Sequence, residues 1–258
     1  MLGNGHFYNR TIRKVVVAFG TLFNDIVVVR YNKDGTTPRE RFKVPLSYGA
    51  KEKYITRLTS DPTMFKSVNI VVPRISFNLD GLSYDASRKQ LTTRQNFSAI
   101  PGSTTNMKSQ YLPIPYNFDF SLSVYVRNTE DGTQILEQIL PFFTPDFTVT
   151  VDFIQPMDQK YDLPIILNSV SSNVDYEGDM MSTRLITWDL NFTAKGFIWP
   201  IIKQNSPYIK YANNNIHVVE DPQQDVKSNT IIIRTILDPI DAELDDEFGF
   251  SETITYNY

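Results

Sequence analysis

Two segments of the chain alternate apolar and polar residues almost without interruption, and this alternation constrains the fold more than any other feature. The first has apolar residues at Tyr116, Phe118, Phe120, Leu122, Val124 and Val126. The second places Thr187, Asp189, Asn191 and Thr193 between Ile186, Trp188, Leu190 and Phe192. A period of two is that of a β-strand, whose successive side chains point to opposite faces of a sheet. Both segments therefore predict strands of a sheet with one apolar and one polar face.

Helical patterns supply elements that can cover the apolar face. Apolar residues spaced by three and four predict one helix through Ile12, Val15, Val16, Phe19, Leu22, Phe23 and Ile26. A second helix is predicted after Asp131 and Gly132, with Ile135, Leu136, Ile139, Leu140 and Phe143 on one face and limits at Pro141 and Pro145. A short helix is predicted over Ala50–Leu58. The simplest arrangement is a sheet with one wet face and one face under helices.

Further extended segments enlarge the sheet without a strict βαβ rhythm. They are Ile26–Tyr31 and Arg41–Leu46, expected to form a hairpin around Lys33–Thr36, and Val68–Leu79, Phe147–Ile154, Leu163–Val170 and Thr230–Leu237. Pro73 cannot donate to a ladder, which predicts a sheet edge or a bulge there, and Asp80 with Gly81 predicts a turn. The predicted class is α+β, with a mainly antiparallel or mixed sheet, a few short flanking helices, long loops and an acidic C-terminal arm.

Two polar stretches suggest how the chain is divided. The segment between Asp85 and Pro115 is predicted to be a long loop, and residues 200–228, rich in proline and asparagine, a long excursion. We expect a core domain in residues 1–200 and, in residues 201–258, the excursion, a final strand and the acidic arm, all within one structural unit. The loop from Asn96 to Ser109 and the arm after Asp238 are expected to be mobile until partners order them.

The formal charge of −4 is unevenly placed. No Lys or Arg follows Arg234, whereas seven acidic residues do: Asp238, Asp241, Glu243, Asp245, Asp246, Glu247 and Glu252. The rest of the chain therefore carries only +3, which does not favour nucleic acid as a partner. The acidic end is predicted to be a solvated arm or a partner-docking arm, with Asp241, Asp245, Asp246 and Glu247 as candidate contacts.

The residue inventory excludes several kinds of chemistry. The chain has no cysteine, so it can form neither a disulfide nor a thiolate zinc site nor a cysteine nucleophile. Its two histidines, His6 and His217, lie near opposite ends. Phosphate-binding glycine loops, nucleophile elbows and metalloprotease helices are missing from the sequence. We therefore expect no cofactor, no metal and no enzymatic activity.

A few charged and polar residues keep other hypotheses open. Asp175, Glu177 and Asp179 surround Gly178, and paired carboxylates are what a glycoside hydrolase needs, although a polar turn between two strands is the preferred interpretation. Arg74 and Arg184 lie in or beside strands and can pair with an acidic residue of a neighbouring subunit or of their own. Together with Asn96 and Ser109, the limits of the polar loop, these arginines are candidate interface residues.

The N-terminal region loosely imitates a secretion signal. Arg10, Arg13 and Lys14 precede the apolar stretch Val15–Phe23, but no small-residue cleavage site follows. No segment reaches the length of apolar sequence that spans a bilayer. We expect a soluble protein made inside the cell, with no membrane partner.

Several strings of residues, in order and in register through residues 6–200, resemble the tail sheath stabiliser and completion proteins of T4-like contractile-tailed bacteriophages. The most specific is the near-continuous run Glu137, Gln138, Ile139, Leu140, Pro141, Phe142, Phe143, Pro145 and Phe147. Others are Phe7–Asn9, Gly20 with Leu22 and Phe23, Pro73–Ile75, Gln110 with Tyr111, and Arg184 with Ile186, Trp188 and Gly196. The resemblance is weak around residues 85–109 and fades past Pro200.

The resemblance implies a structural virion protein. Members of this family form a hexameric ring at the head-proximal end of the tail, hold the outermost sheath layer extended and offer a docking surface to head neck proteins. The implied partners are further copies of the chain, the tail sheath protein, the tail tube or a tube terminator, and the neck proteins, assembled in the host cytoplasm. The alternative is a tail-tube terminator without sheath contacts, as in long-tailed phages with non-contractile tails.

Overall fold

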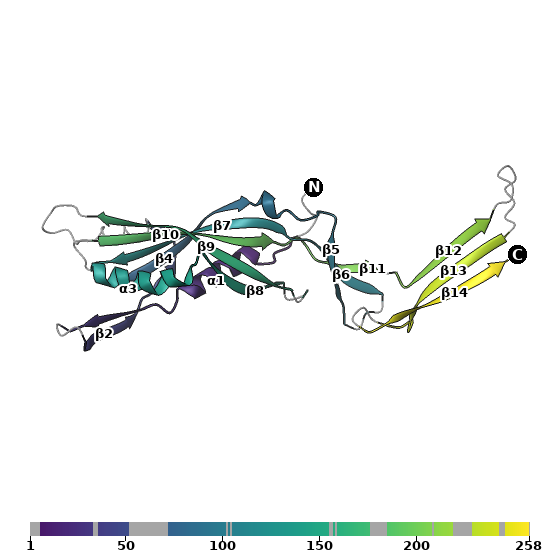
Figure 1. Ribbon diagram of the computed structural model, residues 1–258, viewed down its shortest axis with the longest axis horizontal. Coiled ribbons are helices and arrows are strands. Elements are labelled where there is room, and N and C mark those ends of the chain that lie inside the picture. The colour runs from purple at the N-terminus through teal and green to yellow at the C-terminus, as the bar shows by residue number, and fades with distance from the viewer. Residues whose placement is uncertain are drawn as a thin grey trace. The chain divides into compact units, whose positions relative to one another are not determined.

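The chain forms two compact units, each described separately below (Figure 1). The computed structural model describes residues 6–32, 36–51, 72–101, 103, 105–154, 157, 159–175, 185–207, 209–218, 229–242 and 246–257. One unit comprises Met1–Gln90 and Pro113–Trp199, and the other comprises Leu91–Leu112 and Pro200–Tyr258. The sequence did not reveal that Leu91–Leu112 belongs with the C-terminal segment.

A six-stranded sheet organises the first unit. In spatial order its strands are β3 (Leu46–Tyr48), β4 (Arg74–Tyr84), β7 (Ile114–Val126), β10 (Leu185–Ile198), β9 (Gln159–Asp175) and β8 (Asp146–Ile154). Neighbours are antiparallel except β3 and β4. β7 and β10, which contain the two alternating segments, pair from Ile114 opposite Ile198 to Val126 opposite Ile186. Both segments are strands, as predicted, and together they form the centre of the sheet.

Both described helices of this unit lie on the apolar face. They are α1 (Thr11–Leu22) and α3 (Thr129–Ile139). Phe19 of α1 is fully buried, and its ring stacks on Phe120 of β7 with centroids 4.2 Å apart and meets Phe192 of β10 edge-on at 5.4 Å. Stacked and edge-on ring pairs are the favourable aromatic geometries. The predicted helix-covered face is therefore confirmed, and aromatic packing forms its centre.

Glycine allows α1 to approach the sheet closely. A Cβ atom added at Gly20 would lie 2.7 Å from Cζ of Phe77 on β4, which is closer than two carbon atoms can pack. Gly20 is itself buried. Gly132 plays the same part on α3, where an added Cβ would lie 2.9 Å from Nε1 of Trp188.

Two glutamines of α3 pair with a hairpin that lies beside the helix. Nε2 of Gln138 donates to the carbonyl of Val27 at 2.8 Å, and its Oε1 accepts the Val27 N–H at 3.2 Å. Gln134 makes the same two bonds with Val29, at 2.9 and 3.1 Å. The two amides thus take the place of a neighbouring strand. The hairpin consists of β1 (Val27–Tyr31) and β2 (Pro38–Lys43), and the short 3₁₀ turns of the unit are η1 (Ala86–Arg88) and η2 (Leu140–Phe142).

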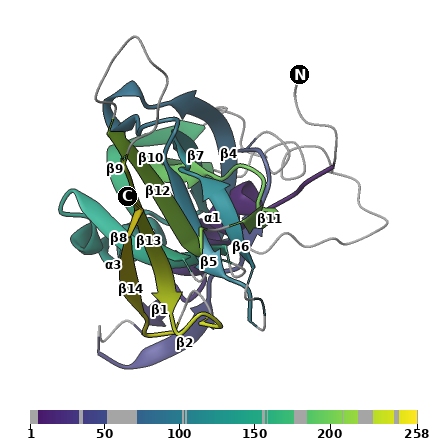
Figure 2. The same ribbon diagram turned by 90° about the vertical axis from the view of Figure 1, so that its right-hand side faces the viewer.

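The second unit contains two antiparallel sheets of three strands each. One has the order β11 (Lys203–Pro207), β6 (Asn106–Tyr111) and β5 (Gln95–Ala99). The other has the order β12 (Tyr211–Val218), β13 (Asn229–Asp238) and β14 (Gly249–Asn257), and its strands lie side by side in Figures 1 and 2. Among the described residues, no helix of either unit combines the length and apolarity needed to cross a membrane.

Several predictions for the polar stretches were wrong. The loop expected between Asp85 and Pro115 contains β5 and β6, and the excursion expected over residues 200–228 contains β11 and β12. The acidic arm also differs, because Gly249–Asn257 pairs with β13 along its whole length. β5, β6, β11 and β12 consist mostly of polar residues and are stabilised by backbone pairing, so apolar periodicity could not reveal them.

Local signals around the first edge of the large sheet were also misleading. Asp80 and Gly81 lie inside β4, at a shift of register against β7, rather than in a turn. Pro73 precedes the first residue of β4 and so disturbs no ladder bond. Of the helix predicted over Ala50–Leu58, the structure describes only its first two positions, with Lys51 helical. The hairpin strands are confirmed, while Lys33, Asp34 and Gly35 of their turn lie outside the described residues.

Replacing Gly20 by alanine should destabilise the first unit. Alanine alone favours a helix by about 1 kcal/mol over glycine, but the clash with Phe77 opposes this, so we expect a net loss of about 1–2 kcal/mol in the free energy of unfolding. The matched control is Val17→Ala on the exposed side of α1, which should change stability by about 0.5 kcal/mol or less. Urea denaturation measures both, and a Gly20→Ala protein as stable as the parent would contradict the close approach.

Candidate functional site

The arginine and loop residues expected at an interface are dispersed. Arg74 opens β4 in the first unit, with Nε and Nη2 3.3 and 3.2 Å from Oγ of Ser47. Asn96 lies half-buried in β5. Ser109 of β6 is almost fully buried and shares a hydrogen bond with Oγ of Ser206 across to β11. Asn96 and Ser109 thus lie on paired strands of the second unit and Arg74 lies in the first, while Arg184 lies outside the described residues.

The acidic candidates lie between the last two strands of the second unit. Asp241, Asp246 and Glu247 are exposed there, and Asp245 lies outside the described residues. Asp175 is the last residue of β9, whereas Glu177 and Asp179 are not described, so the hydrolase hypothesis gains no geometry. Among the described residues no three acidic or histidine side chains form a group that could hold a metal ion.

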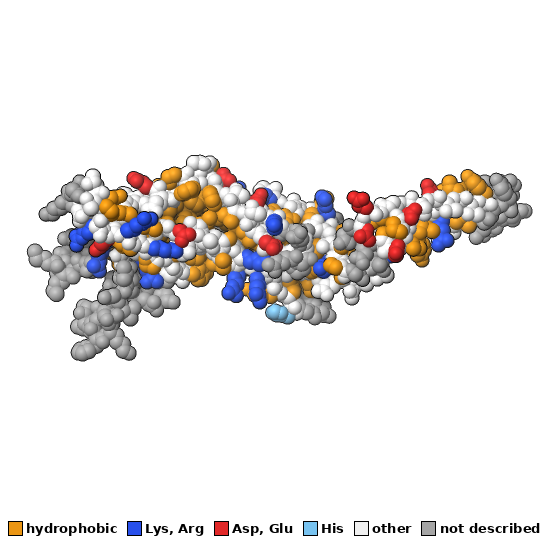
Figure 3. Space-filling view, turned by 90° about the horizontal axis from the view of Figure 1, so that it is seen from below, with side chains coloured by type: hydrophobic (Ala, Val, Ile, Leu, Met, Phe, Trp, Pro, Cys, Tyr) orange, Lys and Arg blue, Asp and Glu red, His pale blue; other side chains and the backbone are white. Residues whose placement is uncertain are grey.

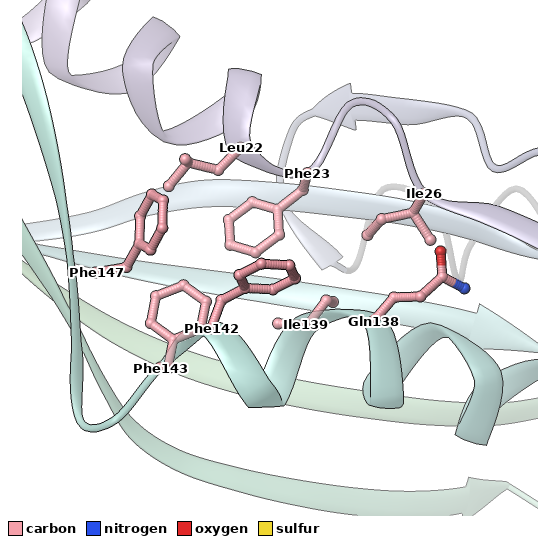
Figure 4. Close-up of a pocket in the computed structure, with 8 residues that line it drawn as sticks. All are labelled: Leu22, Phe23, Ile26, Gln138, Ile139, Phe142, Phe143 and Phe147. Carbon is pink, nitrogen blue, oxygen red and sulfur yellow. The ribbon is translucent and has the colours of Figure 1, made fainter.

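An apolar hollow opens beside the end of α1 (Figure 4). It has a volume of about 150 Å³ and is lined by Leu22, Phe23, Ile26, Gln138, Ile139, Phe142, Phe143 and Phe147. Figure 4 shows the rings of Phe142, Phe143 and Phe147 gathered around Phe23, with Gln138 and Ile26 at the other end. The segment from Gln138 to Phe147, part of the string that resembles the phage family most specifically, thus supplies most of this lining.

The chemistry of the hollow is that of a binding site for apolar side chains. None of the described residues that line it is ionisable, and Gln138, the one polar residue of this lining, already bonds both main-chain groups of Val27. The side chain of Phe142 is 63% exposed, so most of its ring is in contact with water in the single chain. An apolar partner side chain that covers it would contribute about 1.5–3 kcal/mol.

A second hollow, the α1–β8 groove, runs between the helix and the outermost strand of the large sheet. Its volume is about 570 Å³, and its lining residues include Val17, Ala18, Leu22, Val149 and Val151. Arg10 and Arg13 also line it, and both are exposed and form no ion pair with a described residue. Lys14 and Asp152 line it as well, so the groove combines an apolar floor with a net positive charge.

Lys14 occupies one end of this groove. Its Nζ donates to the carbonyls of Asp152 and Phe153, each at 2.8 Å. These bonds cover main-chain acceptors near the end of β8, whose one neighbour among the described strands is β9. Lysine side chains commonly protect edge strands from further pairing, and here the lysine comes from α1. The block covers this end alone, and no described strand pairs with the outer edge of Asp146–Val151.

The polar face of the large sheet is a network of paired side chains. Asp189 of β10 accepts from Oγ of Ser123 at 2.7 Å and pairs with Nζ of Lys51 at 2.5 Å. Asp119 of β7 accepts from Oγ1 of Thr193 at 2.9 Å. Carboxylates held in this way are structural acceptors, so this face offers no unpaired acid for catalysis among the residues named.

The shifted pKa values belong to structural ion pairs. The pKa of Asp85 is lowered to about 2, first by the hydroxyl of Ser87 and then by Arg88, whose Nε lies 2.7 Å away. This carboxylate stabilises the turn η1 at neutral pH, and the effect is lost as the pH falls from its ordinary pKa of 3.8 toward 2. The pKa of Arg30 is raised by its hydrogen bond to buried Asp131, Nη2 to Oδ2 being 2.7 Å.

The sheet β12–β13–β14 presents an apolar face that the sequence did not reveal. On one face, Ile231 and Ile233 of β13 lie opposite Tyr256 and Ile254 of β14, and Ile216 of β12 faces Ile231. None of the five is buried, and Tyr256 is 56% exposed. Figure 3 shows apolar side chains at the surface where Figure 1 places these strands. Apolar exposure of this kind marks a contact surface.

Comparison with known proteins gives two matches. The family model described as T4-like virus Myoviridae tail sheath stabiliser matches residues 6–257. The tail completion protein gp15 of Enterobacteria phage T4 is 31% identical over 221 residues, which cover 83% of this chain and 79% of that protein.

Phe142 and Phe143 should separate binding from stability. Phe143→Ala removes a part-buried ring that lies 5.1 Å from Phe192 and 6.1 Å from Phe147, centroid to centroid, and should cost about 2 kcal/mol of unfolding free energy. Phe142→Ala removes a mostly exposed ring and should cost about 0.5 kcal/mol or less. Denaturant titration of the two variants checks this, and equal losses would contradict the assignment of Phe142 to the surface.

Proposed function

The chain belongs to the T4-like tail sheath stabiliser family, and from this premise we propose that its copies form a hexameric ring closing the head-proximal end of a contractile tail. In this proposal the ring holds the outermost sheath layer extended and gives the head neck proteins a surface to dock on. The family match over residues 6–257 is the observation that carries it. The name of the T4 relative, a tail completion protein, supports the same role.

The surfaces of the chain support a role in binding. The apolar hollow, the α1–β8 groove and the apolar face of β12–β13–β14 each expose side chains that water solvates poorly. A ring needs two different complementary patches on every subunit, because its contacts are heterologous. The first unit supplies hollows and the second an apolar sheet face, so both kinds of patch are present on one chain.

The work proposed for the ring needs no catalytic group. An extended sheath stores free energy, so a stabiliser must bind the extended form more tightly than the contracted one. Moving an equilibrium from 1:99 to 99:1 takes about 5.5 kcal/mol of differential binding. Spread over six subunits, this is roughly 0.9 kcal/mol each, which is less than the burial of one apolar side chain gives. Small geometric differences at each subunit are therefore sufficient.

The proposed partners follow from the same position. They are other copies of the chain, the sheath protein, the tail tube or its terminator, and the neck proteins, all within the virion and assembled in the host cytoplasm. The competing proposal of a tube terminator lacks the sheath contact. The family description names the sheath, which favours the first proposal.

Binding to sheath and tube in parallel tests the function. We expect the purified chain to form rings, alone or on tails, and the free ring should have the mass of six subunits by light scattering. The chain should also co-sediment with sheath assembled in the extended form. Phe142→Ala should weaken co-sedimentation several-fold without loss of stability if the hollow contacts the sheath. Binding to bare tubes and not to sheath would support the terminator instead, and a chain that stays monomeric and binds neither would refute the proposed function.

A further inference from the structure

β8 and β14 are outermost strands, each with an outer edge that pairs with no described strand. β8 closes one side of the six-stranded sheet and β14 one side of the sheet β12–β13–β14. Both are nine residues long. An unpaired edge presents a row of main-chain donors and acceptors that can pair with another strand. The chain therefore carries two edges of similar length.

The side chains of β8 sort into two kinds. Val149 and Val151 line the α1–β8 groove, on the side of the sheet that carries α1. Thr148 and Thr150 alternate with them and are exposed, and Oγ1 of Thr150 donates to Asp162 at 2.7 Å. A strand added at this edge would meet an apolar groove on one side and small hydroxyl side chains on the other.

The side chains of β14 sort in the same way. Phe250, Ile254 and Tyr256 lie on one face and are 66, 48 and 56% exposed. Ser251, Thr253 and Thr255 alternate with them on the opposite face. The strand thus has the two-sided chemistry that the edge of β8 requires.

The groove beside β8 and the segment around β14 carry opposite net charge, because Arg10, Arg13 and Lys14 of the described groove lining outnumber its one carboxylate, that of Asp152. Glu252 lies on the apolar side of β14 between Phe250 and Ile254, and Asp241 and Glu247 precede the strand, all exposed. Arg10 and Arg13 line the α1–β8 groove without an ion pair to a described residue. Opposite charges at an interface favour the matching partner and disfavour like-charged surfaces.

We propose that β14 of one copy adds to the outer edge of β8 in the next copy, joining the two chains by a shared sheet. The apolar side chains of β14 then enter the neighbour's α1–β8 groove, Glu252 approaches Arg10 and Arg13, and the Ser and Thr side chains continue the neighbour's polar face. Strand addition of this kind combines main-chain hydrogen bonds with side-chain pockets. The inference rests on the proposed ring and assigns the contact that closes it.

The charges of the chain favour a second copy of itself as the partner that binds in the α1–β8 groove. The groove is positive, and the acidic segment that would enter it follows Arg234, after which the sequence has no Lys or Arg. The contact joins two different patches, so it can repeat around a closed ring. A symmetric pairing of β8 with β8 would bring the arginines of two grooves together, and one of β14 with β14 would bring the acidic segments together.

Single-cysteine variants test the contact directly, because the parent chain has no cysteine. One variant carries Thr150→Cys in β8, and three others carry Ser251→Cys, Thr253→Cys or Thr255→Cys in β14, spaced to sample alternative registers. After oxidation, mixtures of the first with at least one of the three should give disulfide-linked dimers, whereas each variant alone should give few. A chain with both cysteines should give a ladder that ends at the ring. The matched control mixes Thr150→Cys with Glu137→Cys, whose cysteine lies on the exposed side of α3 and not on β14. These two variants should not cross-link.

The outcomes separate the inference from the proposed function. Rings that form without any β8–β14 cross-link would overturn the inference and leave the proposed function standing. Cross-links that form only within a single chain would also overturn it. So would cross-links that join Thr150→Cys to added sheath protein but never to a second copy of the chain. A chain that associates neither with itself nor with sheath would overturn both.

Charge reversal gives an independent test. Arg10→Glu with Arg13→Glu makes a negative groove, and Asp241→Lys with Glu247→Lys and Glu252→Lys makes a positive strand segment. Each variant alone should assemble at least tenfold more weakly than the parent at low salt, while an equimolar mixture should form alternating rings and a chain carrying all five changes should recover. The proposed charge pairing would be contradicted if neither the mixture nor the chain with all five changes assembled, although circular dichroism showed every variant to be folded.

Discussion

The pairing of β7 with β10 is the constraint on which the first unit depends. Thirteen consecutive residue pairs fix which side chains of the two strands share a face. A shift of β10 by one residue would turn Phe192 away from Phe19 and bring a polar residue into its place. The aromatic packing that holds α1, and the close approach at Gly20, both follow from this register.

The register also explains why the surfaces of the unit differ so sharply. One face binds helices through aromatic rings, and the other holds its carboxylates in hydrogen bonds such as that between Asp189 and Ser123. What remains for partners lies at the margins, in the hollow beside Phe142 and in the groove along β8. A molecule built this way is suited to holding neighbours in a defined geometry.

The sequence predicted the centre of the fold well and its margins poorly. Strands with period two, such as that around Leu122, and the stripe through Val15 and Phe19 carry their own signal, because burial selects their residues. The strands β5, β6 and β11 are mostly polar, and β6 pairs with β11 from far along the chain, so their residues give no local sign of the sheet. The same limit applies to the candidate surfaces. The helical pattern placed Phe143 inward, but no pattern showed that Phe142 or Tyr256 would remain exposed, since exposure depends on what the rest of the fold leaves uncovered.

The central claim is that the chain acts by binding one conformation of its partner in preference to another. The most direct measurement is the affinity of the assembled ring for sheath in its extended and its contracted form, taken under the same buffer conditions. The account predicts much tighter binding to the extended form, approaching a ratio of about 10⁴ where the ring alone prevents contraction. Equal affinity for the two forms would contradict it, because a ligand without differential affinity shifts no equilibrium.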